Sequence, residues 1–140
     1  MTGIIIPVSQ ENVDTLERWR ESWSRQDAEG TIACLHEAVV IDFSAARGPF
    51  QGVYHGPDEV LGLLRSIWEA WDSAIIAFAE VIDCGPDRVI TVNRFQAEGR
   101  NSGIPTGATV ANLWSFRHGL IHRAELFQTK EEALEAVGRV

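Results

Sequence analysis

Two polar side chains in the C-terminal third of the chain could carry out acid–base chemistry, and these are Glu125 and Asn112. On a β-strand the odd-numbered residues from Ile121 to Phe127 share one face, because successive side chains alternate. If that face turns inward, Glu125 is a carboxylate held among aromatic side chains. Desolvation would then raise its pKa toward the range of a general base. Asn112, on the preceding strand of a predicted hairpin, would meet this face and could donate to a developing oxyanion.

Other roles for the charged residues stay open. Glu125 could form a structural ion pair with Arg123 or with Arg94, or it could face solvent or a dimer interface. Arg94 lies in the middle of an apolar run. There it could bind an anionic group of a ligand, or equally face solvent or a second copy of the chain.

The histidines do not form a metal-binding pattern. No second histidine follows His36 at the spacing of a metalloprotease helix, and His118 and His122 lie across a turn rather than on one helix. The sequence also lacks a phosphate-binding loop, a dinucleotide fingerprint and a nucleophile elbow. We therefore expect no metal and no cofactor. Tyr54 could line the mouth of a pocket with its hydroxyl aimed inward, or pack, whereas His55 is expected to cap a helix or face solvent.

Tryptophan is frequent in this chain, with five residues in 140. Each tryptophan taken singly is better explained as core packing. Together they suggest that some line a cavity, because flat rigid rings make good walls for a polycyclic or aromatic ligand.

The elements that must position these residues can be predicted from periodicity. Apolar residues recur at helical spacing over residues 12–26, and a shorter helix that turns Ile32 and Leu35 inward is expected after Asp27. Residues 38–43 indicate a strand, residues 44–56 a loop, and Gly56-Pro57 opens a helix with an apolar stripe that continues to Trp71.

The second half of the chain is predicted to be mainly β. Four runs have strand character, separated by glycine-containing turns; they span residues 75–83, 87–99, 107–117 and 120–128. The two-residue turn His118-Gly119 predicts a tight hairpin. A capping box at 129–132 then opens a short helix that ends at Gly138, with Leu134 and Val137 on one side.

Composition indicates one globular domain over residues 1–140, with 45% apolar and 23% charged residues. The net charge of −8 makes nucleic acid and anionic membrane surfaces poor partners. No apolar run approaches the roughly 18 residues of a membrane span, and no signal peptide is evident, so we expect a cytoplasmic protein. Cys34 and Cys84 lack the spacing of a disulfide framework or zinc site and are expected to be reduced thiols.

Several segments together resemble a known family. These are residues 38–44 (AVVIDFS), 52–60 (GVYHGPDEV), 99–105 (GRNSGIP) and 113–138, which run from a strand through the His-Gly turn to the closing helix. The chain resembles the SnoaL-like polyketide cyclase and ketosteroid isomerase branch of the nuclear-transport-factor-two-like superfamily.

The resemblance implies an α+β cone. A strongly curved, mainly antiparallel sheet forms a barrel packed on three N-terminal helices, with a short C-terminal helix. It further implies a pocket between sheet and helices for a small hydrophobic molecule, and a homodimer formed through the outer face of the sheet. The residues expected to line the pocket are Trp19, Trp23, Phe43, Tyr54, Ile67, Trp71, Arg94, Trp114 and Phe127.

Steroid isomerisation is not expected. Matching the motifs places Trp19, Phe43 and Asn112 where ketosteroid isomerases have a tyrosine, a basic aspartate and a protonated aspartate, and Asp42 lies one residue from the base position, on the other strand face. Two functions remain. One is a cofactor-independent cyclase, isomerase or dehydratase of a small apolar carbonyl compound, with Glu125 as base. The other is a noncatalytic module that binds a hydrophobic ligand or supports a dimer.

Overall fold

The computed structural model describes residues 10–46, 49–99 and 105–138. In chain order its elements are α1 (Gln10–Ser24), α2 (Ala28–Ile32), β1 (Leu35–Asp42), β2 (Val53–His55), α3 (Gly56–Ala70), β3 (Trp71–Asp83), β4 (Arg88–Gly99), β5 (Pro105–Arg117), β6 (Leu120–Phe127) and α4 (Lys130–Gly138). The predicted α+β order is confirmed. The segment 99–105, which contributed to the family resemblance, lies mostly outside the described residues.

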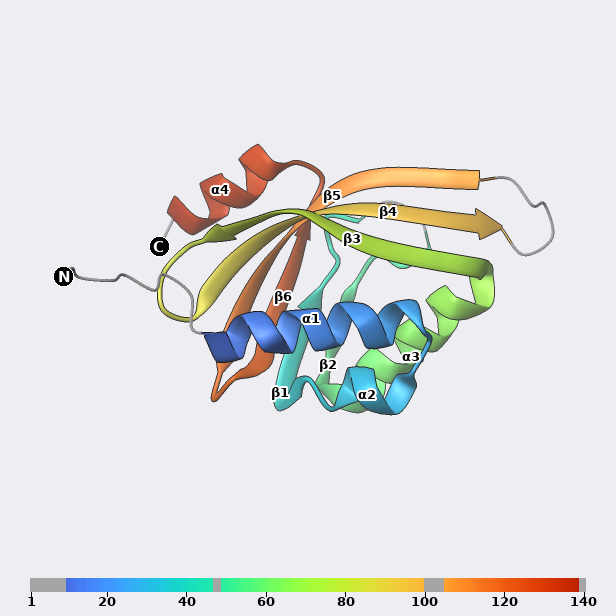
Figure 1. Ribbon diagram of the computed structural model, residues 1–140, viewed down its shortest axis with the longest axis horizontal. Helices are drawn as coiled ribbons and strands as arrows, with labels where there is room; N and C mark the ends of the chain where they lie inside the picture. Colours follow the sequence, from blue (N-terminus) through green and yellow to red (C-terminus); the bar gives the residue numbers. More distant parts are fainter. Residues whose placement is uncertain (1–9, 47–48, 100–104, 139–140) are drawn as a thin grey trace.

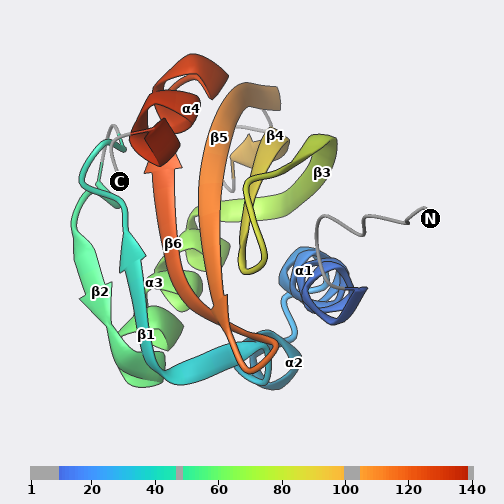
Figure 2. The same ribbon diagram turned by 90° about the vertical axis from the view of Figure 1, so that its left-hand side faces the viewer.

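The six strands form one curved sheet in the order β2-β1-β6-β5-β4-β3 (Figures 1 and 2). All neighbours are antiparallel except β1 and β6, which run parallel. The strongly curved, mainly antiparallel sheet is therefore confirmed. The sheet does not close into a barrel, because the edge strands β2 and β3 do not pair with each other. Helix α3 instead connects the end of β2 with the start of β3.

Several element boundaries differ from the sequence-based expectation. Leu35, expected on the second helix, begins β1 instead, because α2 ends at Ile32. The short edge strand β2 lies inside the predicted loop and pairs with the end of β1, with Tyr54 opposite Ile41. Strand β3 begins at Trp71, where the backbone is extended (φ −127°, ψ 139°) and ends α3. An apolar residue at this position suits the helical stripe and the first strand position equally well, so the pattern alone placed the boundary too late.

Local hydrogen bonds fix the helix starts. The Asp27 side chain accepts a hydrogen bond from Gly30 N at 3.0 Å, so it caps α2. The Thr129 hydroxyl accepts one from Glu132 N at 3.1 Å and caps α4, as the capping box predicted. In α4, Ala133 is buried while Leu134 is 42% exposed.

The His118-Gly119 turn joins β5 to β6 with positive φ at both positions, 54° and 74°. These left-handed conformations match the twist of a two-residue hairpin turn. The Thr15 hydroxyl of α1 donates to Gly119 O at 2.6 Å, and both groups are buried. The turn therefore also anchors the first helix across the sheet.

Helices cover both faces of the sheet. Figure 1 shows α1, α2 and α3 gathered on one side and α4 on the other. The larger core, on the side of the three N-terminal helices, includes Leu16, Val60 and Trp114, whereas α4 packs by Ala133 over Ile90 and Leu113. Within the described residues no helix is long and apolar enough to cross a membrane.

Candidate functional site: a tryptophan-lined cavity

A cavity of about 400 Å³ lies between the concave face of the sheet, α1 and α3. Its size falls within the usual range for small-molecule sites, roughly 300–1,000 Å³. Apolar side chains make up most of its wall. The lining residues are Trp19, Trp23, Ile41, Phe43, Ala46, Phe50, Val60, Leu63, Leu64, Ile67, Trp71, Ile76, Asn93, Phe95, Ala108, Val110, Asn112, Trp114, Ala124, Leu126 and Gln128.

Aromatic rings form a continuous part of this wall. Trp114 meets Trp19 edge-on, with ring centroids 5.0 Å apart and an interplanar angle of 69°. Trp19 contacts Trp23, which meets Phe95 edge-on, and Phe95 in turn meets Trp71 at 5.9 Å. Edge-to-face contacts of this kind are favourable beyond the area that they bury. The rings therefore hold one another in place and give the cavity a rigid side.

One indole is fixed further by a buried hydrogen bond. Trp114 is 1% exposed, and its Nε1 donates to the Thr91 hydroxyl at 2.8 Å. This bond satisfies the polar edge of the ring within the sheet. The indole consequently presents an apolar surface to the cavity.

Three amides supply the polar side chains of the described lining, and these are Asn93, Asn112 and Gln128. Asn93 Nδ2 donates to Asn112 Oδ1, and Asn112 Nδ2 donates to Glu125 O at 3.4 Å. None of the lining residues that the structure describes has a titratable side chain. Across the described ranges, no cluster of three or more His, Cys, Asp or Glu side chains could hold a metal ion.

Seven of the residues singled out from the sequence line this cavity. They come from α1, α3, β3, β5 and the position that follows β1, and they are Trp19, Trp23, Phe43, Ile67, Trp71, Asn112 and Trp114. Trp68, the remaining tryptophan, is buried in the core and packs edge-on against Trp23.

Glu125 does not face the cavity, which corrects the expected orientation of β6. In a regular hairpin without a register shift, counting from the His118-Gly119 turn, Asn112 would lie opposite Glu125. The register shifts between Ser115 and Phe116, so Asn112 pairs with Leu126 instead. A single-residue shift reverses which side chains of a strand point inward. Ala124 and Leu126 therefore line the cavity, and Glu125 turns to the outer face.

On the outer face Glu125 belongs to an ionic cluster. Arg123 Nε lies 3.2 Å from Glu125 Oε1, and Arg123 Nη2 lies 3.1 Å from Asp42 Oδ2. Burial opposes ionisation of Asp42, but hydrogen bonds from Ser44 and the charge of Arg123 outweigh it and hold the Asp42 pKa below its ordinary value. Glu125 thus forms the structural ion pair with Arg123 that was one of the roles expected for it.

Two further residues that were expected to contact the ligand also lie outside the cavity. Arg94 is exposed and follows Asn93, whose side chain is on the inner face, so the guanidinium points outward. Phe127 packs with the apolar cluster beneath α4, because it shares the strand face of Glu125. Both side chains point away from the cavity because side chains alternate along a strand.

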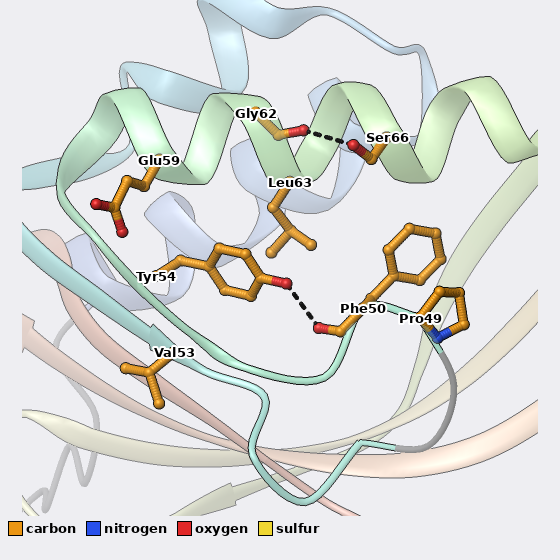
Figure 3. A pocket seen from close by; sticks show the side chains of 8 residues that line it. All are labelled: Pro49, Phe50, Val53, Tyr54, Glu59, Gly62, Leu63 and Ser66. Atoms are coloured by element: carbon orange, nitrogen blue, oxygen red, sulfur yellow. Dashed lines mark hydrogen bonds between the residues drawn. The ribbon is translucent and has the colours of Figure 1, made fainter.

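Tyr54 lines a separate groove between β2 and α3, of about 640 Å³. Figure 3 shows its hydroxyl pointing toward the backbone of Phe50, to whose carbonyl it donates at 2.8 Å. Phe50 and Leu63 line both the groove and the cavity. Tyr54 is therefore separated from the cavity by this shared wall, and its hydroxyl is committed to the backbone.

Asn93 and Phe95 are among the cavity-lining residues that sequence reasoning missed. Both lie on β4 and face inward on either side of the outward Arg94. Asn93 is 3% exposed. An amide next to the apolar run 89–92 was the available signal, since buried polar side chains in strands generally have a partner or a role.

Residues 16–124 match the family model of the SnoaL-like domain. The chain belongs to the SnoaL-like family. This confirms the resemblance found in the sequence. No curated protein sequence matches the chain significantly.

The fold of this SnoaL-like chain is shared with several solved structures. TerC, co-crystallised with polyporic acid, is 18% identical, with a TM-score of 0.74 over 92% of this chain and 99% of TerC. RV0760c from Mycobacterium tuberculosis, in complex with estradiol-17β-hemisuccinate, is 14% identical, with a TM-score of 0.74 over 86% of this chain and 95% of that one. A computationally designed 17-OHP binder is 15% identical, with a TM-score of 0.73 over 86% and 95%.

The three positions aligned with the ketosteroid isomerase machinery all line the cavity of this SnoaL-like chain. They hold Trp19, Phe43 and Asn112. Asp42, next to the base position, instead pairs with Arg123 on the outer face. At these three positions the SnoaL-like fold of this chain thus has two aromatic side chains and an amide.

Proposed function

We propose that this protein binds an uncharged, mostly apolar small molecule in the tryptophan-lined cavity. The observation that carries the proposal is the cavity wall itself, which combines rigid aromatic rings with three amides and no titratable side chain among its described residues. An apolar ligand gains by leaving water, whereas a charged group would be desolvated there without a partner. Two structural neighbours, one co-crystallised with polyporic acid and one in complex with estradiol-17β-hemisuccinate, support a small-molecule ligand.

The same observation favours binding over acid–base catalysis. A cyclase or isomerase that removes a proton next to a carbonyl needs a base within hydrogen-bond reach of that proton. The carboxylate suggested for this role, Glu125, lies on the outer face and pairs with Arg123. The noncatalytic ligand-binding module is therefore the function that the geometry supports best.

A pair of tryptophan substitutions on β5 tests the proposal. Val110 lines the cavity, whereas its neighbour Thr109 is exposed on the opposite strand face. Val110→Trp should fill the cavity and weaken binding by about tenfold or more. Thr109→Trp adds the same side chain outside and should leave binding unchanged.

Binding can be followed by isothermal titration calorimetry with estradiol and, as a smaller neutral probe, naphthalene. We expect both to bind to the unmodified protein and to lose affinity only in Val110→Trp. If neither probe binds, or if the two variants weaken binding equally, the cavity is not a binding site for neutral apolar molecules.

We also propose that two copies pair through the outer face of the sheet, as expected from the family. Ile75 is 54% exposed and lies opposite Gln96 on this face. An exposed apolar side chain on an open sheet face favours association. Ile75→Glu should shift the sedimentation coefficient toward that of a monomer, and a chain that is already monomeric at micromolar concentration would contradict the pairing.

A further inference from the structure

The Asn93–Asn112 pair has a defined polarity because its outer partner is a backbone carbonyl. Glu125 O can only accept, so the Asn112 amide nitrogen must face it, at 3.4 Å. That orientation turns Asn112 Oδ1 toward Asn93, which must then present its own nitrogen as donor. The alternative amide orientations would place acceptor against acceptor or donor against donor. The series of hydrogen bonds that starts at Glu125 O and runs through Asn112 therefore ends at Asn93 Oδ1.

Asn93 Oδ1 is left as an acceptor without a partner in the described structure. The residue lines the cavity and is only 3% exposed, so bulk water does not satisfy this oxygen. Buried side-chain acceptors are nearly always paired, because an unpaired one forfeits its hydrogen bonds to water. Asn93 Oδ1 is thus a buried acceptor on a cavity-lining residue, and the described residues provide no donor for it.

The surroundings of this oxygen make a hydrogen bond to it selective. Val110, the cross-strand neighbour of Asn93, and Phe95, two residues along β4, also line the cavity. Hydrogen bonds are stronger in such an apolar setting than in water, and a mismatched polar group is correspondingly penalised. A ligand carbonyl placed there would set one acceptor against another.

We infer that the ligand of this cavity carries a hydrogen-bond donor, an alcohol or phenol hydroxyl or an N–H group, which it donates to Asn93 Oδ1. The inference rests on the proposed function and narrows it to donor-bearing apolar molecules.

Matched probes that differ only in donor capacity test this. 2-Naphthol has a hydroxyl donor, and 2-methoxynaphthalene keeps the oxygen but has no donor. By titration calorimetry on the full chain, we expect 2-naphthol to bind about tenfold more tightly than its methyl ether. Asn93→Leu should abolish or reverse this preference. Glu125→Gln, on the outer face, should preserve it.

A second pair of probes tests the same preference on the unmodified protein, without any substitution. Indole donates through its N–H and 1-methylindole cannot, so the unmodified protein should prefer indole by a similar factor. Equal affinity within both pairs, or a preference that persists in Asn93→Leu, would overturn the assignment of Asn93 while leaving apolar binding intact. Failure of naphthalene and of all four probes to bind would instead refute the proposed function.

Discussion

Replacing the two cavity asparagines by leucine tests the unpaired acceptor through folding stability, without any ligand. Leucine branches at the same carbon as asparagine and so preserves much of the shape of each side chain. A buried polar group without a partner costs about 1–3 kcal/mol, whereas a made hydrogen bond contributes about 1 kcal/mol net. Asn93 and Asn112 are both less than 10% exposed, so these values for buried groups apply to them.

The four forms should therefore differ in a characteristic order. Asn93→Leu removes one unpaired oxygen but leaves Asn112 Oδ1 without its donor, so its free energy of unfolding should stay within about 1 kcal/mol of the parent. Asn112→Leu leaves both polar atoms of Asn93 unpaired and removes the donor to Glu125 O, so it should lose about 1–3 kcal/mol. The double variant has no unpaired amide and should be about 1 kcal/mol more stable than the parent.

Urea denaturation measures these differences, provided that the slope of unfolding is the same for each form. Gln96→Leu, an exposed position on the same strand β4, is the matched control and should change stability by no more than about 0.5 kcal/mol. Additivity of the two single substitutions to within about 0.5 kcal/mol would show that the amides act independently. Additivity, or a double variant less stable than Asn112→Leu, would contradict the assignment of Asn93 Oδ1 as an unpaired acceptor.

Two other predictions concern stability. Burial and the positive charges around His122, Arg117 foremost, hold its pKa below the ordinary value, so the folded state favours the neutral ring. Stability should fall as pH drops below about 6.5, and urea midpoints measured between pH 5 and 8 should change less with pH in His122→Gln. Trp114→Phe removes the hydrogen bond to Thr91 and part of the ring that packs on Trp19, and should lower the unfolding free energy by about 2–3 kcal/mol in the same assay. An unchanged midpoint in this variant would mean that the sheet accommodates the loss.

Features that depend on local chemistry were predictable from the sequence. The stripe from Val60 to Trp68 marks α3 because helical periodicity is set within a few turns, and the His118-Gly119 turn marks the hairpin because few residue pairs adopt its conformation. The family segments added the order of the elements. The helical periodicity and the family segments together predicted that tryptophans would line the cavity.

Which face of β6 points into the cavity was not predictable, because it depends on one extra residue in the pairing of β5 with β6. The register shift between Ser115 and Phe116 carries no distinctive sequence signal such as a glycine. It nevertheless moves Leu126 inward and Glu125 outward, and so decides whether the cavity contains a carboxylate. Tertiary pairing, and not local propensity, sets this choice.

The parallel pairing of β1 with β6 has a consequence for the order in which the chain can fold. Strands β3 to β6 follow one another and can pair as consecutive hairpins, but β1 joins the sheet only through β6, with Ile41 opposite Ala124. During synthesis the strand at residues 35–42 must therefore wait until the strand at 120–127 has left the ribosome. Such distant pairing slows folding, since a long loop must close before the contact forms. Until then the apolar side of β1 is open to solvent, and this interval is when the nascent protein is most exposed to aggregation and to chaperones.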